Sequence, residues 1–189
     1  MKLKIVKFKK VKSTNDEAIK LIKKNKIHPT ILTAETQKKG RGTMGKKWIS
    51  KKGNLFISIF FELNSKKINY KVFSILNAHI LKKILKKYSK SKIEIKWPND
   101  LLIRGKKLCG ILQEVIIFKN KKYLIIGIGI NTLHSPNNKS FLSTSLKKFS
   151  NSTIKNIVIL KDIILVYEKL LSDIRNHKIS YLKKNYCKN

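Results

Sequence analysis

IEIKWPND, at residues 93–100, joins a short apolar strand to a rigid polar turn. Pro98 ends the strand because it has no backbone N–H to donate to a sheet. The residues that follow predict a hairpin, with strands at 101–103 and 107–117 on either side of a turn at 104–105. We therefore expect a β-sheet to be built around this part of the chain.

The remaining elements are predicted from the spacing of apolar residues. Alternating or continuous apolar runs indicate strands, whereas a spacing of three or four residues indicates helices. The expected strands lie at 3–8, 31–34, 55–61 and 123–130, and the expected helices begin near residue 13 and cover 70–88 and 157–174. Ser13 is a candidate N-cap for the first helix. This order predicts an α+β fold, a mixed β-sheet packed with helices, in one domain over residues 1–189.

Charge is the unusual part of the composition. The chain has 44 Lys and Arg against 10 Asp and Glu, which gives a formal net charge of +34. Arginine occurs only at positions 41, 104 and 175, and the lysines are spread along the chain. Nucleic-acid readers usually use clustered arginine, so we interpret the charge mainly as compositional drift and expect no nucleic-acid partner. A basic surface would still speed encounter with an acidic partner.

The cysteines and the N-terminus indicate where the protein works. Cys109 and Cys187 offer no disulfide framework, which favours a reducing compartment. The first eleven residues alternate apolar and lysine residues, unlike a signal peptide, and no apolar stretch is long enough to span a bilayer. We expect a cytoplasmic protein with no membrane partner. Cys109 lies in an apolar strand and is expected to be an inert core thiol.

A glycine-rich basic loop, GRGTMGKKW, occupies residues 40–48. Its glycines let backbone N–H groups converge, and Arg41, Lys46 and Lys47 add positive charge, so the loop suits a carboxylate or a phosphate. It is not a P-loop, because the Gly-Lys-Ser/Thr sequence is missing. A lysine-rich loop without function is the alternative interpretation.

Lys96 is stronger evidence for a functional site than the loop is. It lies on the face opposite Ile93 and Ile95, and on a central strand we expect it to have an anionic partner, because burying an unpaired ammonium is costly. The alternative is an ordinary lysine on an edge strand. Lys107, which the alternation places on the same face as Cys109, could complement Lys96.

Three further features could belong to the same site. Asn99 and Asp100 could order a metal-bound nucleotide or simply cap the turn. Gly127 and Gly129 leave one face of their strand without side chains, so a flat ligand or another backbone could lie there. Glu114 is expected to pair with a basic residue. The four histidines show no metal-ligand spacing, and the metal site is left unassigned.

Several motifs occur together in a fixed order. They are STN at 13–15, Gln37, GRG at 40–42, Trp48, GNL at 53–55, KWPND at 96–100, KLCGIL at 107–112 and GIGIN at 127–131. In these motifs the chain resembles the biotin–protein ligases, also called biotin–[acetyl-CoA-carboxylase] ligases. The resemblance implies a catalytic domain like those of class II aminoacyl-tRNA synthetases and biotin–lipoyl ligases.

The resemblance implies a reaction in two steps. Biotin, as the substrate, and ATP with Mg²⁺ would give biotinyl-5′-adenylate and pyrophosphate. The biotinyl group would then pass to a lysine of the biotin carboxyl carrier protein of acetyl-CoA carboxylase. Family members often dimerise through the sheet, so a homodimer is possible. The alternative is a lipoyl or octanoyl ligase or transferase, which has the same fold.

The resemblance also assigns roles to individual residues. Lys96 and Arg41 would be catalytic, neutralising carboxylate and phosphate oxygens. The biotin site would be formed by Ser13, Thr14, Asn15, Gln37, Arg41, Gly42, Thr43, Lys96 and Gly127. The nucleotide site would be formed by Gly40, Lys46, Trp48, Asn99 and Asn131.

The sequence departs from the family pattern in two ways. Thr43 stands where many members have arginine, so we expect weaker retention of the adenylate. The resemblance also leads us to expect a catalytic domain alone, without the N-terminal helix-turn-helix domain and the C-terminal SH3-like domain that some members have. Without a helix-turn-helix domain, we expect no operator binding.

Overall fold

The computed structural model describes residues 1–63, 70–136 and 141–187, and its centre is a mixed β-sheet. The order of the strands in this sheet is β1-β2-β3-β7-β6-β5-β4. The strands are β1 (Lys4–Val11), β2 (Thr30–Gln37), β3 (Leu55–Leu63), β4 (Ile93–Lys96), β5 (Asp100–Ile103), β6 (Lys106–Phe118) and β7 (Lys121–Ile130). β1 and β2 run parallel, and the other neighbouring pairs are antiparallel.

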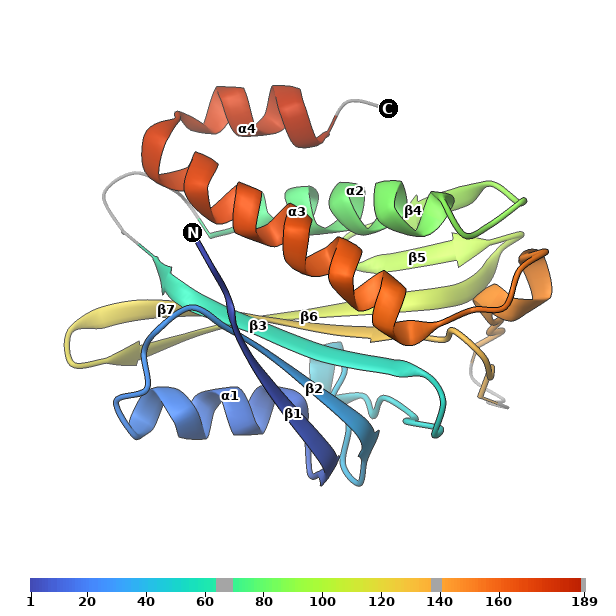
Figure 1. Ribbon diagram of the computed structural model, residues 1–189, viewed down its shortest axis with the longest axis horizontal. Coiled ribbons are helices and arrows are strands. Elements are labelled where there is room, and N and C mark those ends of the chain that lie inside the picture. Colours follow the sequence, from blue (N-terminus) through green and yellow to red (C-terminus); the bar gives the residue numbers. More distant parts are fainter. Residues whose placement is uncertain (64–69, 137–140, 188–189) are drawn as a thin grey trace.

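Helices cover both faces of the sheet. They are α1 (Thr14–Lys23), α2 (Val72–Lys86), α3 (Asn156–Asn176) and α4 (Ile179–Tyr186). Figure 1 shows α1 below the sheet and the other three helices above it. Two short 3₁₀ turns add η1 (Thr43–Gly45) and η2 (Leu146–Phe149). The predicted α+β fold is therefore confirmed, although α4, only eight residues long, was not expected.

Two hydrophobic clusters hold the layers together. The larger one lies between the sheet and the helices above it, where the rings of Phe61 and Phe73 are 5.6 Å apart. The smaller one lies between α1 and the sheet and includes Ile22, Leu32 and Phe60. β3 contributes to both clusters because it is buried on both faces, as its apolar sequence predicts.

Two local expectations were wrong. β4 is an edge strand and Lys96 is exposed, so Lys96 does not lie on a central strand. A register shift between Leu101 and Leu102 places Lys107 beside Gly110, whereas Cys109 packs into the larger core on the other face. At a bulge the regular alternation of side chains between the two faces of a strand is interrupted. Ser13 occupies the N-cap position of α1, as expected, although its side chain makes no capping hydrogen bond.

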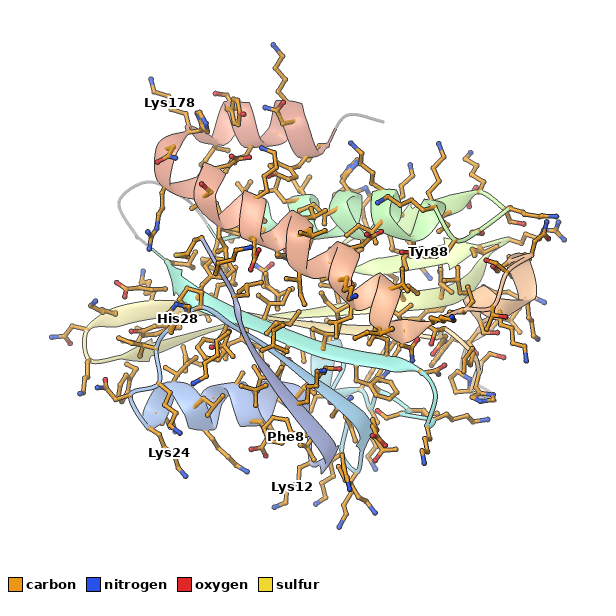
Figure 2. The ribbon with its side chains drawn as sticks, in the orientation of Figure 1. Phe8, Lys12, Lys24, His28, Tyr88 and Lys178 are labelled. Carbon is orange, nitrogen blue, oxygen red and sulfur yellow. The ribbon has the colours of Figure 1, made fainter. Side chains whose placement is uncertain are left out.

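The lysines extend outward from many parts of the surface. Figure 2 shows Lys12, Lys24 and Lys178 pointing away from three separate regions of the molecule. The lysines are spread over the surface, just as they are spread along the sequence. None of the helices in the described residues is long and apolar enough to cross a membrane.

Candidate active site

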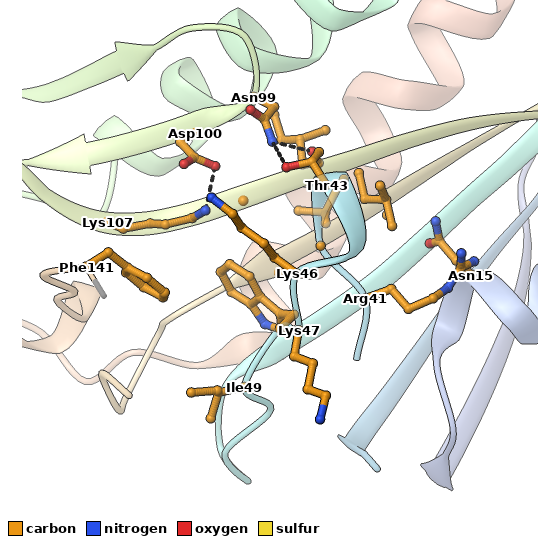
Figure 3. Close-up of a pocket in the computed structure, with 18 of the residues that line it drawn as sticks. Asn15, Arg41, Thr43, Lys46, Lys47, Ile49, Asn99, Asp100, Lys107 and Phe141 are labelled. Atoms are coloured by element: carbon orange, nitrogen blue, oxygen red, sulfur yellow. Dashed lines mark hydrogen bonds and ion pairs between the residues drawn. The ribbon is translucent and has the colours of Figure 1, made fainter. Parts of the chain in front are cut away.

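A cavity of about 870 Å³ opens on the α1 side of the sheet (Figure 3). It is bordered by the start of α1, the glycine-rich loop, the turn between β4 and β5, and the glycines of β6 and β7. This volume is typical of small-molecule sites. All of the predicted site residues line the cavity except Gly40 and Asn131.

One end of the cavity is polar but uncharged. The backbone N and Oγ1 of Thr14 donate to Gln37 Oε1 at 2.8 and 3.2 Å, and Gln37 Nε2 donates to Ser50 Oγ at 3.0 Å. Ser58 Oγ lies 2.8 Å from Thr14 Oγ1 and 2.5 Å from Asn15 Oδ1. Because these groups fix one another, they present donors and acceptors to a ligand in set directions.

Arg41 lies beside this polar end and is held by two carboxylates. Its Nη1 and Nη2 atoms donate to Glu114 Oε1 and Oε2, each at 2.8 Å, and Nη2 also lies 3.0 Å from Asp16 Oδ1. Asn15 Nδ2 donates to Glu114 Oε2 at 2.6 Å. The expected pairing of Glu114 with a basic residue is confirmed. Figure 3 shows Arg41 pointing towards Asn15 and away from Lys107.

The other end of the cavity is basic, and Lys107 is its best-placed cation. Lys107 Nζ lies 2.7 Å from Asp100 Oδ1 and 5.6 Å from the ring centroids of Trp48 and Phe141. Its side chain is 22% exposed, whereas Lys96 projects from the edge of the sheet. The sequence interpretation placed Lys107 behind Lys96, because the bulge that turns Lys107 into the cavity was not visible in the alternation.

Trp48 and Asn15 cover the glycine face of β6 and β7. A Cβ atom on Gly110 would lie 2.7 Å from the indole of Trp48, and a Cβ atom on Gly129 would collide with the same ring. A Cβ atom on Gly127 would collide with the side chain of Asn15. The bare face that we expected to receive a ligand or another backbone therefore holds two of the chain's own side chains.

The glycine-rich loop is a compact hairpin. Gly42 N donates to Lys46 O at 2.7 Å, and Trp48 N donates to Gly40 O at 2.9 Å. Its tip has left-handed backbone, with φ of 53° at Met44 and 72° at Gly45. Asn99 Nδ2 donates to Thr43 Oγ1 at 3.4 Å, which ties the loop to the turn after β4. That turn contains a cis peptide bond between Trp97 and Pro98.

Gly40 and Asn131 support the site from outside the cavity. Gly40 is buried, and a Cβ atom there would lie 2.5 Å from Trp48 O. Asn131 is also buried, and its Nδ2 donates to Lys107 O at 3.4 Å. Asn131 therefore contacts the backbone of the lysine instead of facing the cavity directly.

Two donors beside the cavity are available for a ligand. Arg41 Nε and Trp48 Nε1 are buried and have no hydrogen-bond partner among the residues that the structure describes. Buried donors of this kind usually have partners. Cys109, by contrast, lies fully in the core, where burial raises the pKa of its thiol. This agrees with the expected inert role.

Comparison with known proteins gives the family. A sequence model of the biotin/lipoate A/B protein ligase family matches residues 7–131, which is well over half of the chain. The chain is a member of the biotin/lipoate A/B protein ligase family. Its structure resembles that of the biotin protein ligase from Aquifex aeolicus in complex with biotin and ATP, with a TM-score of 0.78. The two sequences are 27% identical, over 97% of this chain and 76% of that one.

Two relatives in the ligase family are similar along the sequence. The bifunctional ligase/repressor BirA of Bacillus subtilis is 30% identical over 177 residues, which cover 90% of this chain and 54% of BirA. The biotin–[acetyl-CoA-carboxylase] ligase of Paracoccus denitrificans is 31% identical over 127 residues, which cover 66% of this chain and 52% of the relative. The chain thus spans about half the length of these relatives.

Proposed function

We propose that this ligase-family chain activates biotin with ATP and transfers it to a lysine of a biotin carboxyl carrier protein. The names of its relatives support this substrate, and the Aquifex structure contains biotin and ATP. The lipoate protein ligase of Thermoplasma acidophilum has the same fold, with a TM-score of 0.62, but is only 11% identical. A lipoyl or octanoyl substrate is therefore the weaker alternative.

The observation that carries the proposal is the polarity of the cavity. Its neutral end, around Thr14, Asn15 and Gln37, offers hydrogen-bond donors and acceptors that match a ureido ring. Its basic end, around Lys107, suits a carboxylate and phosphates. A molecule with a ureido ring at one end and a carboxylate at the other would place its ring at the neutral end of the cavity and its carboxylate at the basic end.

The first step would join biotin to AMP. A carboxylate oxygen of biotin attacks the α-phosphorus of ATP, and the bond to pyrophosphate breaks. Because two anions must approach each other, catalysis depends on positioned cations more than on a strong base. Lys107 is placed for this role by its contacts, while Lys46 and Lys96 line the same cavity.

Magnesium would arrive with the nucleotide. The described residues contain no group of three or more His, Cys, Asp and Glu side chains that could hold a metal. The cavity offers one carboxylate, Asp100, beside the amide of Asn99. This donor set fits Mg²⁺ bound mainly by substrate phosphates, where the ion would neutralise phosphate charge.

The second step would release AMP. The neutral amine of the carrier lysine attacks the acyl carbon, an amide bond forms, and AMP departs while the amine loses its proton. Cys109 has no place in this route because it is buried in the core on the other face of the sheet. The two free cysteines are consistent with a reducing cytoplasm, which we propose as the location.

ATP–pyrophosphate exchange tests the first step directly. Purified protein is given MgATP with biotin or with octanoate, and isotope exchange into ATP is measured. Exchange that depends on biotin is expected. Exchange with octanoate alone would favour the alternative, and no exchange with either acid would contradict carboxylate activation by this chain.

A further inference from the structure

Arg41 and Glu114 connect two distant parts of the chain. Arg41 belongs to the glycine-rich loop, and Glu114 lies on β6, 73 residues later. Both terminal nitrogens of the guanidinium bond to the carboxylate at 2.8 Å. This two-point geometry fixes orientation as well as distance.

Two side chains of α1 join the same contact. Asp16 lies 3.0 Å from Arg41 Nη2, and Asn15 donates to Glu114 at 2.6 Å. One guanidinium therefore joins the loop to both α1 and β6. The Arg41 and Glu114 side chains are 36% and 25% exposed, so the contact is partly shielded from water.

The charges of this group argue against a direct role for Arg41 on the reacting atoms. One guanidinium faces the carboxylates of Asp16 and Glu114, so the three side chains carry a formal net charge of −1 (one positive, two negative). Such a group attracts a carboxylate or a phosphate less than an unpaired lysine does, because Nη1 and Nη2 are engaged and only Nε is left to donate. Lys46 and Lys96, in contrast, line the cavity and have no acidic partner among the described residues.

We propose that Arg41 and Glu114 form a latch that holds the glycine-rich loop against α1 and β6. Both are then positioning residues for the proposed reaction, on which the kinetic part of this inference rests. Because Trp48 N donates to Gly40 O, fixing Arg41 also fixes the segment that lays Trp48 on Gly110 and Gly129. The latch thus determines the shape of the cavity at both ends.

The fluorescence of Trp48 tests the latch without any substrate. The chain has two tryptophans, so a Trp97→Phe background leaves Trp48 as the only reporter. In this background Glu114→Gln is expected to shift the emission to longer wavelength and to increase quenching by acrylamide. Glu62→Gln is the matched control, because Glu62 pairs with Lys121 at 3.0 Å on the exposed surface. An unchanged Trp48 signal in a folded Glu114→Gln variant overturns the latch.

Pyrophosphate exchange distinguishes a latch from a catalytic cation. Arg41→Met, Glu114→Gln and the double variant are compared, with thermal unfolding as a check of folding. Residues that act through one contact have non-additive effects, so the double variant should be no slower than the worse single variant. Losses that multiply would show that Arg41 acts on the reacting groups.

Arg41→Lys sharpens the kinetic test. It keeps the charge but loses the planar fork, so a latch predicts a loss close to that of Arg41→Met, about 100-fold for a loop displaced by an ångström. The loss should include a raised KM for biotin. Wild-type activity in Arg41→Lys would overturn the latch. Glu114→Asp, which withdraws the carboxylate by one methylene, replaces Glu114→Gln if that variant does not fold.

The two proposals fail in different ways. If wild-type protein shows no exchange with any acid, the proposed function is wrong, and the Trp48 measurement still decides whether the latch exists. If exchange is normal and Glu114→Gln leaves both Trp48 and kinetics unchanged, only the latch is wrong.

Discussion

Lys107 Nζ lies 2.7 Å from Asp100 Oδ1, and this ion pair sets the lysine inside the cavity between two aromatic rings. Asp100 comes from the strand next to the turn, and Lys107 from the bulged start of β6. The pair prevents Lys107 from extending into solvent, and the rings limit its motion. A cation held in this way needs little rearrangement when charge develops nearby.

Lys107→Ala should reduce pyrophosphate exchange more than Lys96→Ala does. Removing one preorganised group that stabilises developing charge typically costs about 100-fold or more in kcat. Lys96 is exposed on an edge strand, so we expect a smaller loss there. Lys106→Ala, an exposed neighbour on the same strand, is the control. Equal losses at positions 96 and 107 would contradict the ranking of the two lysines.

Gly129→Ala should destabilise the fold through its contact with Trp48. The added methyl group would overlap the indole ring, and overpacking of this kind costs roughly 1–3 kcal/mol. The free energy of unfolding can be measured with urea. In a Trp48→Ala background the same substitution should cost much less, and a full cost there would show that the strain has another source.

Thr43→Arg should slow the release of the adenylate. The substitution adds a cation at a position that lines the cavity, where it can pair with the phosphate. Release can be followed by rapid dilution of preloaded protein. Met44→Arg adds the same charge at a neighbouring side chain that is 93% exposed, and it should have little effect. Tight retention by the unmodified chain would contradict the expectation drawn from Thr43.

Acid should loosen the packing of α4. Burial raises the pKa of Asp173, but hydrogen bonds from Tyr186 at 2.7 Å and Lys169 at 3.0 Å outweigh it, so the net pKa lies below its usual value. Because the carboxylate is favoured in the folded state, its contribution is complete above about pH 4 and is lost as the pH falls through the lower folded pKa.

Asp173→Asn provides the measurement for this prediction. Its free energy of unfolding should depend less on pH than that of the wild type between about pH 4 and pH 2, the range of carboxyl titration. Glu94→Gln removes a carboxylate on an exposed side chain and should leave the slope nearly unchanged. Parallel curves for Asp173→Asn and the wild type would show that Asp173 does not titrate abnormally.

Local patterns predicted much of this fold. The continuous apolar run of β3, the turn at Arg104 and Gly105, and the helical spacing of α2 each specify their own element. The family motifs then marked most of the residues that line the cavity. These signals are contained within short segments, so one sequence is enough to detect them.

Relations between distant segments could not be predicted in the same way. The contact of Arg41 with Glu114 depends on how the loop lies over β6, and the position of Lys107 depends on a bulge. The edge position of β4 follows from the order of all the strands. Alternation gives the face of a residue only while the register is regular.

The glycines beneath Trp48 have a consequence for ligand engineering. At this end the cavity is shaped by one bulky ring resting on Gly110 and Gly129, which contribute no side chains. Shortening Trp48 would open a space of about the size of an indole without altering the polar end near Gln37. Under the proposed function, such a variant would accept enlarged nucleotide analogues that the natural chain excludes. An enlarged analogue would then be used by this variant alone in a mixture with other ligases of the family.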